Sequence, residues 1–234
     1  MKKFIIENDF WAVFPEAKIG IITCKGIDNT PRDQAFYEQL LEEAETQVPK
    51  HVPNENFSEN AVIKVWRDAF QQFKTKKGAR SSIEALLKRV NNGNHLTPIN
   101  PLVDIYNAIS LTYALPCGGE DIDCFEGDIR LTKALGDEPF VTLGTTENDS
   151  PYTGEIVYKD DAGAICRCWN WREAVRTMLT EHTQNAFLCV ELVDLNRIDV
   201  FHEALEALAA NVKTHLGGSV EIKVLDQANP WVEI

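Results

Sequence analysis

Apolar residues recur at helical spacing in the first half of the chain. Within residues 58–73 they occupy positions 62, 65, 66, 69, 70 and 73, the stripe of an amphipathic helix. A Ser-Ser-Ile-Glu capping box begins a second helix over 81–90, and an Asn-Pro pair begins a third over 100–113. A further helix is expected over 33–47, after a proline. The pattern therefore predicts a group of helices early in the chain.

The second half is different, because short β-rich segments alternate with turn residues. Strands are expected over 3–7, 18–25, 128–134, 140–143, 155–158, 164–169, 186–193 and 220–225, with a helix over 199–215. The glycine-rich, acidic segment 115–127 fits neither pattern. We predict an α+β fold in which mixed, largely antiparallel sheets and packed helices surround one core. No long linker interrupts residues 1–234, so a single domain is expected.

Composition narrows the class of protein. Hydrophobic residues make up 44% of the 234 residues, but apolar runs such as 187–190 are far too short to span a membrane. An acid follows the basic start within the first seven residues, so no signal peptide is expected and we predict a cytoplasmic protein. The six cysteines form no Cys-x-x-Cys pair and have no suitably placed histidine. We expect reduced thiols, no metal and no cofactor.

Charge is unevenly distributed along the chain. A net charge of −13 argues against sequence-independent binding to nucleic acid, and DNA is not an expected partner. Eight basic residues nevertheless fall within 64–89, opposed there by two acids, while the remainder has 15 basic and 34 acidic residues. This basic segment could hold an RNA end, or it could be a solvated pair of helices. Nothing in the sequence sets the oligomeric state.

Two polar segments are candidates for chemistry. Asp104 and Asn107 are three residues apart on the predicted third helix, so they share a face that could orient a ligand or a water, or could brace neighbouring loops. Gly118 and Gly119 follow Cys117 and permit close backbone approach, which could offer amide N–H groups to a carbonyl oxygen. A simple turn is the alternative for this glycine pair.

Two later segments add aromatic and acidic groups. Trp169 and Trp171 lie in an Arg-Cys-Trp-Asn-Trp-Arg segment that would suit stacking of a base or an aromatic side chain, unless both are core residues. Glu181 could act as a base toward water, and Thr183 places a hydroxyl beside it. No Gly-x-Ser-x-Gly motif and no His-x-x-x-His spacing occurs, so serine and zinc hydrolases have no support.

Several of these segments together resemble a known domain. The helix with Val103-Asp-Ile-Tyr-Asn107, followed by Gly127-Asp-Ile-Arg-Leu, Gly136-Asp-Glu and Gly154-Glu-Ile-Val-Tyr, is similar to the tRNA-editing domain of the bacterial phenylalanyl-tRNA synthetase β subunit. That domain comprises the paired third and fourth domains of the subunit. The resemblance covers about residues 60–195 and is strongest to a free-standing branch with the Trp-Asn-Trp-Arg segment. It implies hydrolysis of mischarged aminoacyl-tRNA by water, without a covalent nucleophile.

The resemblance also suggests roles for individual residues. Asn107 and Glu181 would position the water and the ester, and Gly118 stands where the synthetases have a histidine, so tyrosine specificity does not transfer. The expected substrate-binding residues are Asp104, Gly118, Gly119, Trp169, Trp171 and Thr183. The expected tRNA-binding residues are Arg67, Lys76, Lys77 and Arg80. Two alternatives stay open: a non-catalytic module that binds aminoacyl-tRNA, an amino acid or a protein, and a hydrolase of small amino-acid esters or amides.

Overall fold

Two β-sheets form the centre of the molecule. The computed structural model describes residues 2–234. The six-stranded sheet has the order β10 (Trp231–Glu233), β1 (Lys3–Ile6), β4 (Ile129–Lys133), β5 (Ile156–Asp160), β6 (Gly163–Arg167) and β7 (Arg172–Glu173). The four-stranded sheet has the order β3 (Cys117–Asp121), β8 (Asn185–Leu192), β2 (Lys18–Lys25) and β9 (Ser219–Leu225). β1 and β4 pair in parallel, and the other ladders are antiparallel.

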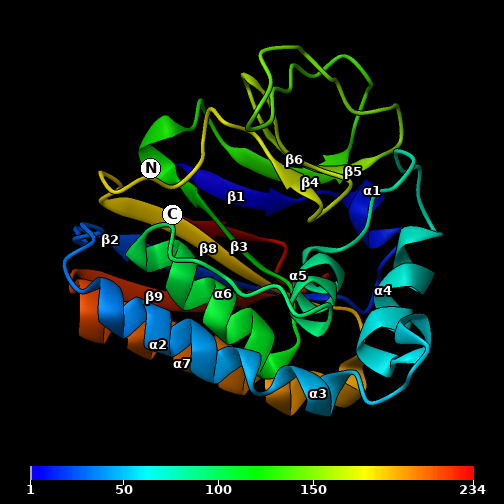
Figure 1. Cartoon of the computed structure of the whole chain (residues 1–234). Coiled ribbons are helices and arrows are strands. Elements are labelled where there is room, and N and C mark those ends of the chain that lie inside the picture. Colours follow the sequence, from blue (N-terminus) through cyan, green and yellow to red (C-terminus); the bar gives the residue numbers. More distant parts are fainter. Residues whose placement is uncertain (1) are drawn as a thin grey trace.

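Helices cover one face of the four-stranded sheet. The helices of the molecule are α1 (Asn8–Trp11), α2 (Gln34–Glu45), α3 (Val48–His51), α4 (Ala61–Phe70), α5 (Ser82–Asn91), α6 (Pro101–Tyr113) and α7 (Ile198–Leu216), with short 3-10 turns at 57–59, 122–124 and 195–197. α2, α6 and α7 pack together below the sheet in Figure 1, while α4 and α5 flank its edge. The predicted α+β class with largely antiparallel sheets is confirmed. No helix within residues 2–234 is long and apolar enough to cross a membrane.

The four-stranded sheet divides the interior into two apolar layers. Along β8, Phe187 and Cys189 point to the six-stranded sheet, whereas Leu188 and Val190 point to the helices. This alternation follows from the two-residue period of a strand, and both faces of β8 are therefore buried. On the helix side, α7 approaches β2 so closely that a Cβ on Gly20 would lie 2.5 Å from Leu205 Cδ1.

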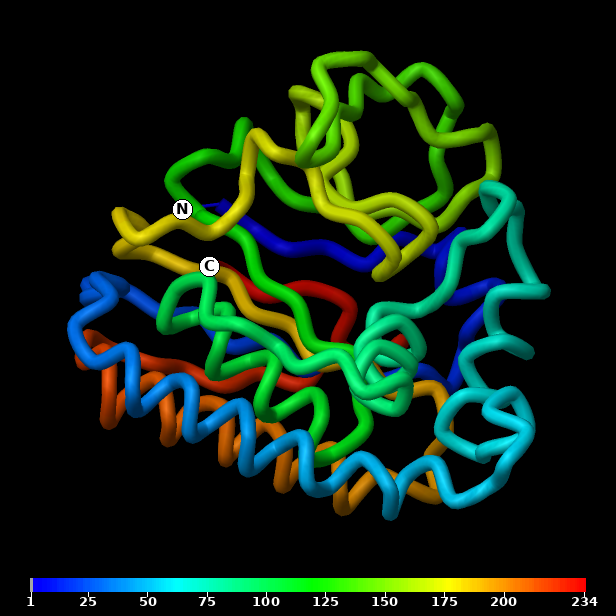
Figure 2. Tube along the Cα trace, viewed as in Figure 1, coloured from blue at the N-terminus to red at the C-terminus, as the bar shows by residue number. Residues whose placement is uncertain are grey.

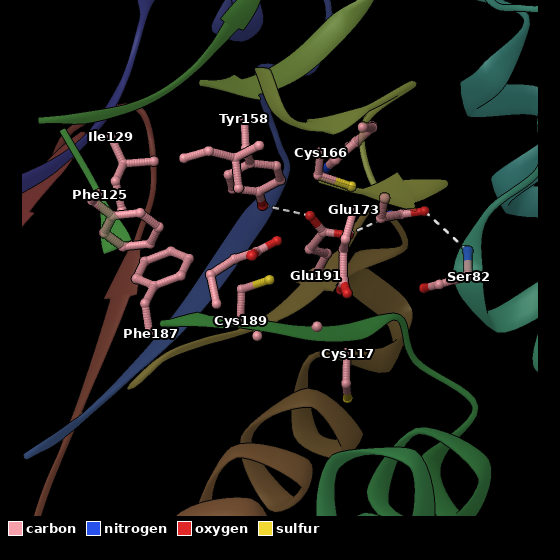
Figure 3. Close-up of a pocket in the computed structure, with 16 residues that line it drawn as sticks. Ser82, Cys117, Phe125, Ile129, Tyr158, Cys166, Glu173, Phe187, Cys189 and Glu191 are labelled. Carbon is pink, nitrogen blue, oxygen red and sulfur yellow. Dashed lines mark hydrogen bonds between the residues drawn. The ribbon is translucent and has the colours of Figure 1, made fainter. Parts of the chain in front are cut away.

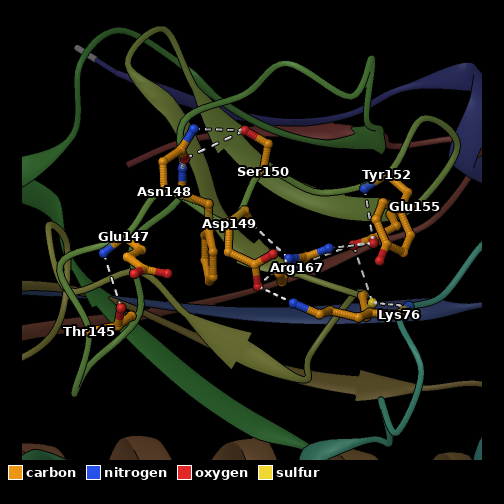
Figure 4. Close-up of polar contacts among 11 residues, drawn as sticks. Lys76, Thr145, Glu147, Asn148, Asp149, Ser150, Tyr152, Glu155 and Arg167 are labelled. Atoms are coloured by element: carbon orange, nitrogen blue, oxygen red, sulfur yellow. Dashed lines mark hydrogen bonds and ion pairs between the residues drawn. The ribbon is translucent and has the colours of Figure 1, made fainter.

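A buried ion-pair network anchors the long connection between β4 and β5, which rises above the six-stranded sheet in Figure 2. Arg167 is fully buried, and its Nη2 lies 2.6 Å from Oε1 of the equally buried Glu155. Its Nη1 donates to the carbonyl of Asp149, whose carboxylate also pairs with Lys76 (Figure 4). Since each buried charge has a partner, the network ties this connection to the segment between α4 and α5.

A strained turn joins β6 to β7. Cys168 and Trp169 both have positive φ, at 48° and 65°. Residues other than glycine adopt this conformation at a cost of roughly 1 kcal/mol or more each. The turn directs the Trp169 ring inward against Phe10, Phe14 and Trp66, and burial of that aromatic cluster offsets the strain.

Most predicted elements are present, with small differences at their ends. Two expectations are wrong: residues 140–143 make only an isolated bridge, Thr142 to Ala174, and the predicted strand over 164–169 ends at Arg167. Phe140 instead packs under the Arg167 guanidinium, so side-chain anchoring replaces a sheet ladder there. The unassigned segment 115–127 contains β3, an edge strand of the four-stranded sheet.

Candidate functional site

A cavity lies between the two sheets. It leaves a volume of about 40 Å³ for the centres of water-sized molecules, and one end is lined by the buried side chains of Phe125, Ile129 and Phe187. The remaining lining residues are Ser82, Cys117, Gly118, Gly119, Glu120, Tyr158, Ile165, Cys166, Trp169, Asn170, Glu173, Cys189 and Glu191. Figure 3 shows the apolar residues gathered at one end and Ser82 at the other, so the cavity has an apolar closed end and a polar mouth.

Three carboxyl groups face this cavity: Glu120, Glu173 and Glu191. Burial raises the pKa of Glu173 to about 7, although the backbone N–H of Gly119 opposes the shift. Burial also raises the pKa of Glu191 to about 7, and that of Glu120 well above its usual value, with the neighbouring Glu173 adding to the rise. Within residues 2–234, no lysine, arginine or histidine lines the cavity. The interior is therefore an acidic site without an internal counter-ion.

Polar atoms in the lining lack protein partners. Oε2 of Glu120, Oγ of Ser82 and Nε1 of Trp169 are buried and make no hydrogen bond within the described chain. An unpartnered buried polar atom costs about 1–3 kcal/mol. Because such groups are rare in folded proteins and three of them share one cavity, the cavity suits a polar ligand or ordered water.

The Glu191 carboxylate is fixed in place by two donors. It accepts hydrogen bonds from the Tyr158 hydroxyl and from Nδ2 of Asn170 (Figure 3). Oδ1 of Asn170 in turn accepts from the backbone N–H of Ser82 at 3.2 Å. This chain of contacts links the middle of the cavity to the N-terminus of α5 at its mouth. Ser81 caps that helix by accepting from the N–H of Glu84.

Three thiols also line the cavity, on Cys117, Cys166 and Cys189. Burial raises the pKa of each of them, so they are protonated at neutral pH and are poor nucleophiles. No group of three or more His, Cys, Asp or Glu side chains in residues 2–234 is arranged to hold a metal ion. The cavity therefore offers carboxyl chemistry rather than thiolate chemistry.

A surface groove adjoins the mouth of the cavity. It runs between α5 and α6, and the two spaces share Ser82, Cys117, Asn170 and Glu173. The other groove residues are Ala85, Leu86, Arg89, Tyr106, Asn107, Ser110 and Trp171. Glu173 thus stands at the junction, where a group in the cavity and a group in the groove would meet.

The structure brings five of the predicted substrate-site residues to this region. Gly118, Gly119 and Trp169 line the cavity, and Asn107 and Trp171 line the groove. Trp169 is fully buried, so it is not the exposed stacking surface that the sequence suggested. The glycines lie in β3 rather than in a loop. A Cβ on Gly118 would lie 3.4 Å from Oε1 of Glu173, so the lack of a side chain there keeps the cavity wall open, whereas Gly119 faces Leu188 on the helix side.

Three other predicted residues lie elsewhere. Glu181 is exposed on a turn and lines neither space. Thr183 is buried and donates to Oδ2 of Asp121 at 2.7 Å, which braces the same turn. Asp104 accepts from the N–H of Ile99 at 2.8 Å, so it braces the entry to α6 while Asn107 faces the groove.

The predicted tRNA-binding residues divide into two kinds. Arg67 makes a bidentate pair with Glu84, at 2.6 Å for the shortest contact, and Lys76 pairs with Asp149. Lys77 and Arg80 make no ion pair within the described part of the chain, and Arg80 lines a surface pocket between α4 and α5. Only part of the basic segment is therefore available to an external anion.

Sequence reasoning missed the acidic residues of the cavity. Glu191 is the residue whose sequence context could have indicated the site, because it stands in β8 among apolar residues and shares a face with Phe187 and Cys189. A carboxyl group on a strand face that is otherwise apolar indicates a buried polar site. Glu173 follows the Trp-Asn-Trp-Arg segment directly, yet nothing in its local sequence indicates that it faces Gly118 and Gly119.

Two segments of this chain are similar in sequence to known proteins. A segment of 50 residues is 46% identical to the phenylalanine–tRNA ligase β subunit of Mycoplasmoides gallisepticum, covering 21% of this chain and 6% of that subunit. A segment of 63 residues is 40% identical to the same subunit of Streptococcus pneumoniae, covering 26% of this chain and 8% of that one. The aligned segments are thus a small part of these long relatives.

An N-terminal fragment of the phenylalanyl-tRNA synthetase β subunit from Pyrococcus horikoshii is a similar solved structure, with a TM-score of 0.47 and 12% identity over 93% of this chain and 49% of that chain. Residues 65–210 match the family described as the B3/4 domain. These residues include α5, α6, β3 and β8, and hence most of the cavity and groove. Because the match spans more than half of the chain, the protein belongs to the B3/4 domain family.

Proposed function

We propose that the protein binds the aminoacyl end of a tRNA in the cavity and hydrolyses its ester bond. The observation that carries this proposal is the acidic cavity, with three carboxyl groups and no internal cation. Membership of the B3/4 family and the similarity to tRNA ligase β subunits support tRNA as the source of the ester.

The charge of the cavity distinguishes an aminoacyl ester from a free amino acid. Both have an α-ammonium group, which a buried carboxylate would pair with, but only the free amino acid has a carboxylate. That second charge would be repelled by the ionised forms of Glu173 and Glu191, whose pKa values lie at about 7. An ester is therefore the preferred ligand, and the free acid formed by hydrolysis would be released.

Glu173 is the best-placed general base. Its pKa of about 7 gives it substantial ionisation and substantial basicity at neutral pH, and it stands at the junction of cavity and groove. It would take a proton from water while the water oxygen attacks the ester carbonyl. The carbon–oxygen bond to the ribose then breaks, and the proton passes to the departing ribose oxygen. Asn107 and the start of α5 would orient the ester.

The test is ester loss from a panel of misacylated tRNAs. The wild-type protein should release amino acid above the buffer rate from at least one tRNA, with a rate that rises as pH passes about 7, after correction for spontaneous hydrolysis. Glu173→Gln should lower the rate by about 100-fold or more, which is the usual contribution of a general base. It should also remove the pH-dependent rise.

Glu181→Gln is the matched comparison, because it makes the same change at an exposed acid outside both spaces. Its rate should equal that of the wild type, and a large loss would return Glu181 to the reaction. No release from any tRNA in the panel would contradict the proposal. Tight binding of aminoacyl-tRNA without turnover would instead favour the non-catalytic module.

A further inference from the structure

We propose that the groove between α5 and α6 is a nucleotide subsite, with the phosphate of the terminal nucleoside at Arg89. This inference rests on the proposed function, since it places the alcohol part of the ester whose acyl part enters the cavity. The groove and the cavity share the residues at the mouth. Because Phe125, Ile129 and Phe187 close the opposite end, the alcohol part of the ester can only lie outward, along the groove.

The walls of the groove follow from helical spacing. Ser82, Ala85, Leu86 and Arg89 line it and occupy one face of α5, at intervals of three and four residues. Arg89 is seven positions after Ser82, which places it about 10 Å along the helix from the mouth. This length is sufficient for one nucleoside between an ester at the mouth and a phosphate at Arg89.

The chemistry of the groove also suits a nucleotide. Arg89 is the single cation in its lining, it is exposed, and it makes no ion pair within residues 2–234. Its Nη2 donates to the carbonyl of His95, which fixes the guanidinium without neutralising its charge. Trp171 presents a half-buried indole, over which the Arg172 guanidinium already lies at 4.9 Å from the ring centroid, so a base would stack on the remaining ring surface. The Asn107 amide can bond to a ribose hydroxyl or a base edge.

Binding of adenosine 5′-monophosphate, compared with adenosine, tests this subsite without any ester. In ¹H–¹⁵N spectra of the full chain, the nucleotide should shift the indole signal of Trp171 and the side-chain amide of Asn107. The indole of Trp231, which is exposed on β10, should not move. We expect adenosine 5′-monophosphate to bind about tenfold more tightly than adenosine, as one charge-assisted contact allows.

Two neighbouring variants make the test specific. Arg89→Gln should abolish the preference for the phosphate-bearing ligand. Lys88→Gln removes the same charge one residue earlier on α5, where the side chain faces the pocket toward α4, and should preserve the preference. Equal losses in both variants, no shift of Trp171, or equal affinity for the two ligands would overturn the inference. If the protein hydrolyses the misacylated tRNAs but adenosine 5′-monophosphate does not shift the Trp171 signal, only the nucleotide subsite is refuted. If the nucleotide binds but no misacylated tRNA is hydrolysed, only the proposed hydrolysis is refuted.

Discussion

The half-buried carboxyl of Glu173 makes the stability of the protein depend on pH. In the folded state its pKa is about 7, against an ordinary value of 4.5. The folded protein therefore binds more protons than the unfolded chain between these two values, and its free energy of unfolding falls as pH rises through this interval. The difference between these two pKa values corresponds to about 3 kcal/mol, all of it lost above pH 7.

Glu173→Gln should remove this loss, because the amide keeps the shape of the side chain and has no charge. The free energy of unfolding of the variant, relative to the wild type, should rise by about 3 kcal/mol between pH 4 and pH 8. Urea unfolding followed by tryptophan fluorescence at several pH values measures this difference. Comparison at each pH cancels the titration of other groups.

Glu16→Gln is a suitable control, since Glu16 is exposed and makes no hydrogen bond or ion pair within the described residues. Its pH dependence should follow that of the wild type. If Glu173→Gln also follows the wild type between pH 4 and pH 8, then Glu173 is hydrated in the folded protein. A hydrated Glu173 would no longer support the proposal that the cavity binds an ammonium group.

Three further outcomes are expected. Arg167→Ala should lower the free energy of unfolding by about 3–5 kcal/mol, because it leaves Glu155 buried without its partner. Thermal denaturation measures this loss, and a much smaller loss would mean that water reaches Glu155. Binding of an amino-acid methyl ester at pH 7 should release up to about one proton from the protein, since the ammonium group of the ester favours the ionised forms of Glu173 and Glu191. Calorimetry in buffers of different ionisation enthalpy measures this release. Gly119→Ala should cost about 1–3 kcal/mol of stability, because the new Cβ would lie 2.5 Å from a methyl carbon of Leu188, and an unchanged melting temperature would contradict the packing.

Local patterns determined much of the secondary structure. The apolar stripe and capping box in residues 58–90, and the Asn-Pro pair before α6, predicted helices that the structure contains. β2 was predicted at its observed bounds, because its run of β-branched residues is a purely local signal. The same local signals failed at residues 140–143, where contacts with Arg167, distant in the chain, decide the conformation.

Only some residues of the candidate site could be predicted from the sequence. Asn107 and the glycine pair of β3 were predicted from the resemblance and from the backbone freedom of glycine, and the structure places them in the lining of the groove and the cavity. The acids of the cavity were not predicted, since Glu120 and Glu191 meet through the pairing of β3 with β8, and Glu173 of β7 joins them only when the two sheets pack. Glu181 was predicted instead because the resemblance to the synthetase domain suggests a glutamate in this part of the chain, whereas its turn lies outside the cavity.

The sequence by itself therefore determined which segments form helices and strands, the α+β class and the family, since these depend on spacing and on short motifs. Only the tertiary structure decided which carboxyl groups are removed from solvent and which basic side chains form ion pairs. Burial of Glu173 and pairing of Arg67 with Glu84 are properties of surfaces that come together on folding. The pKa of a group is set by that environment, and no local pattern records it.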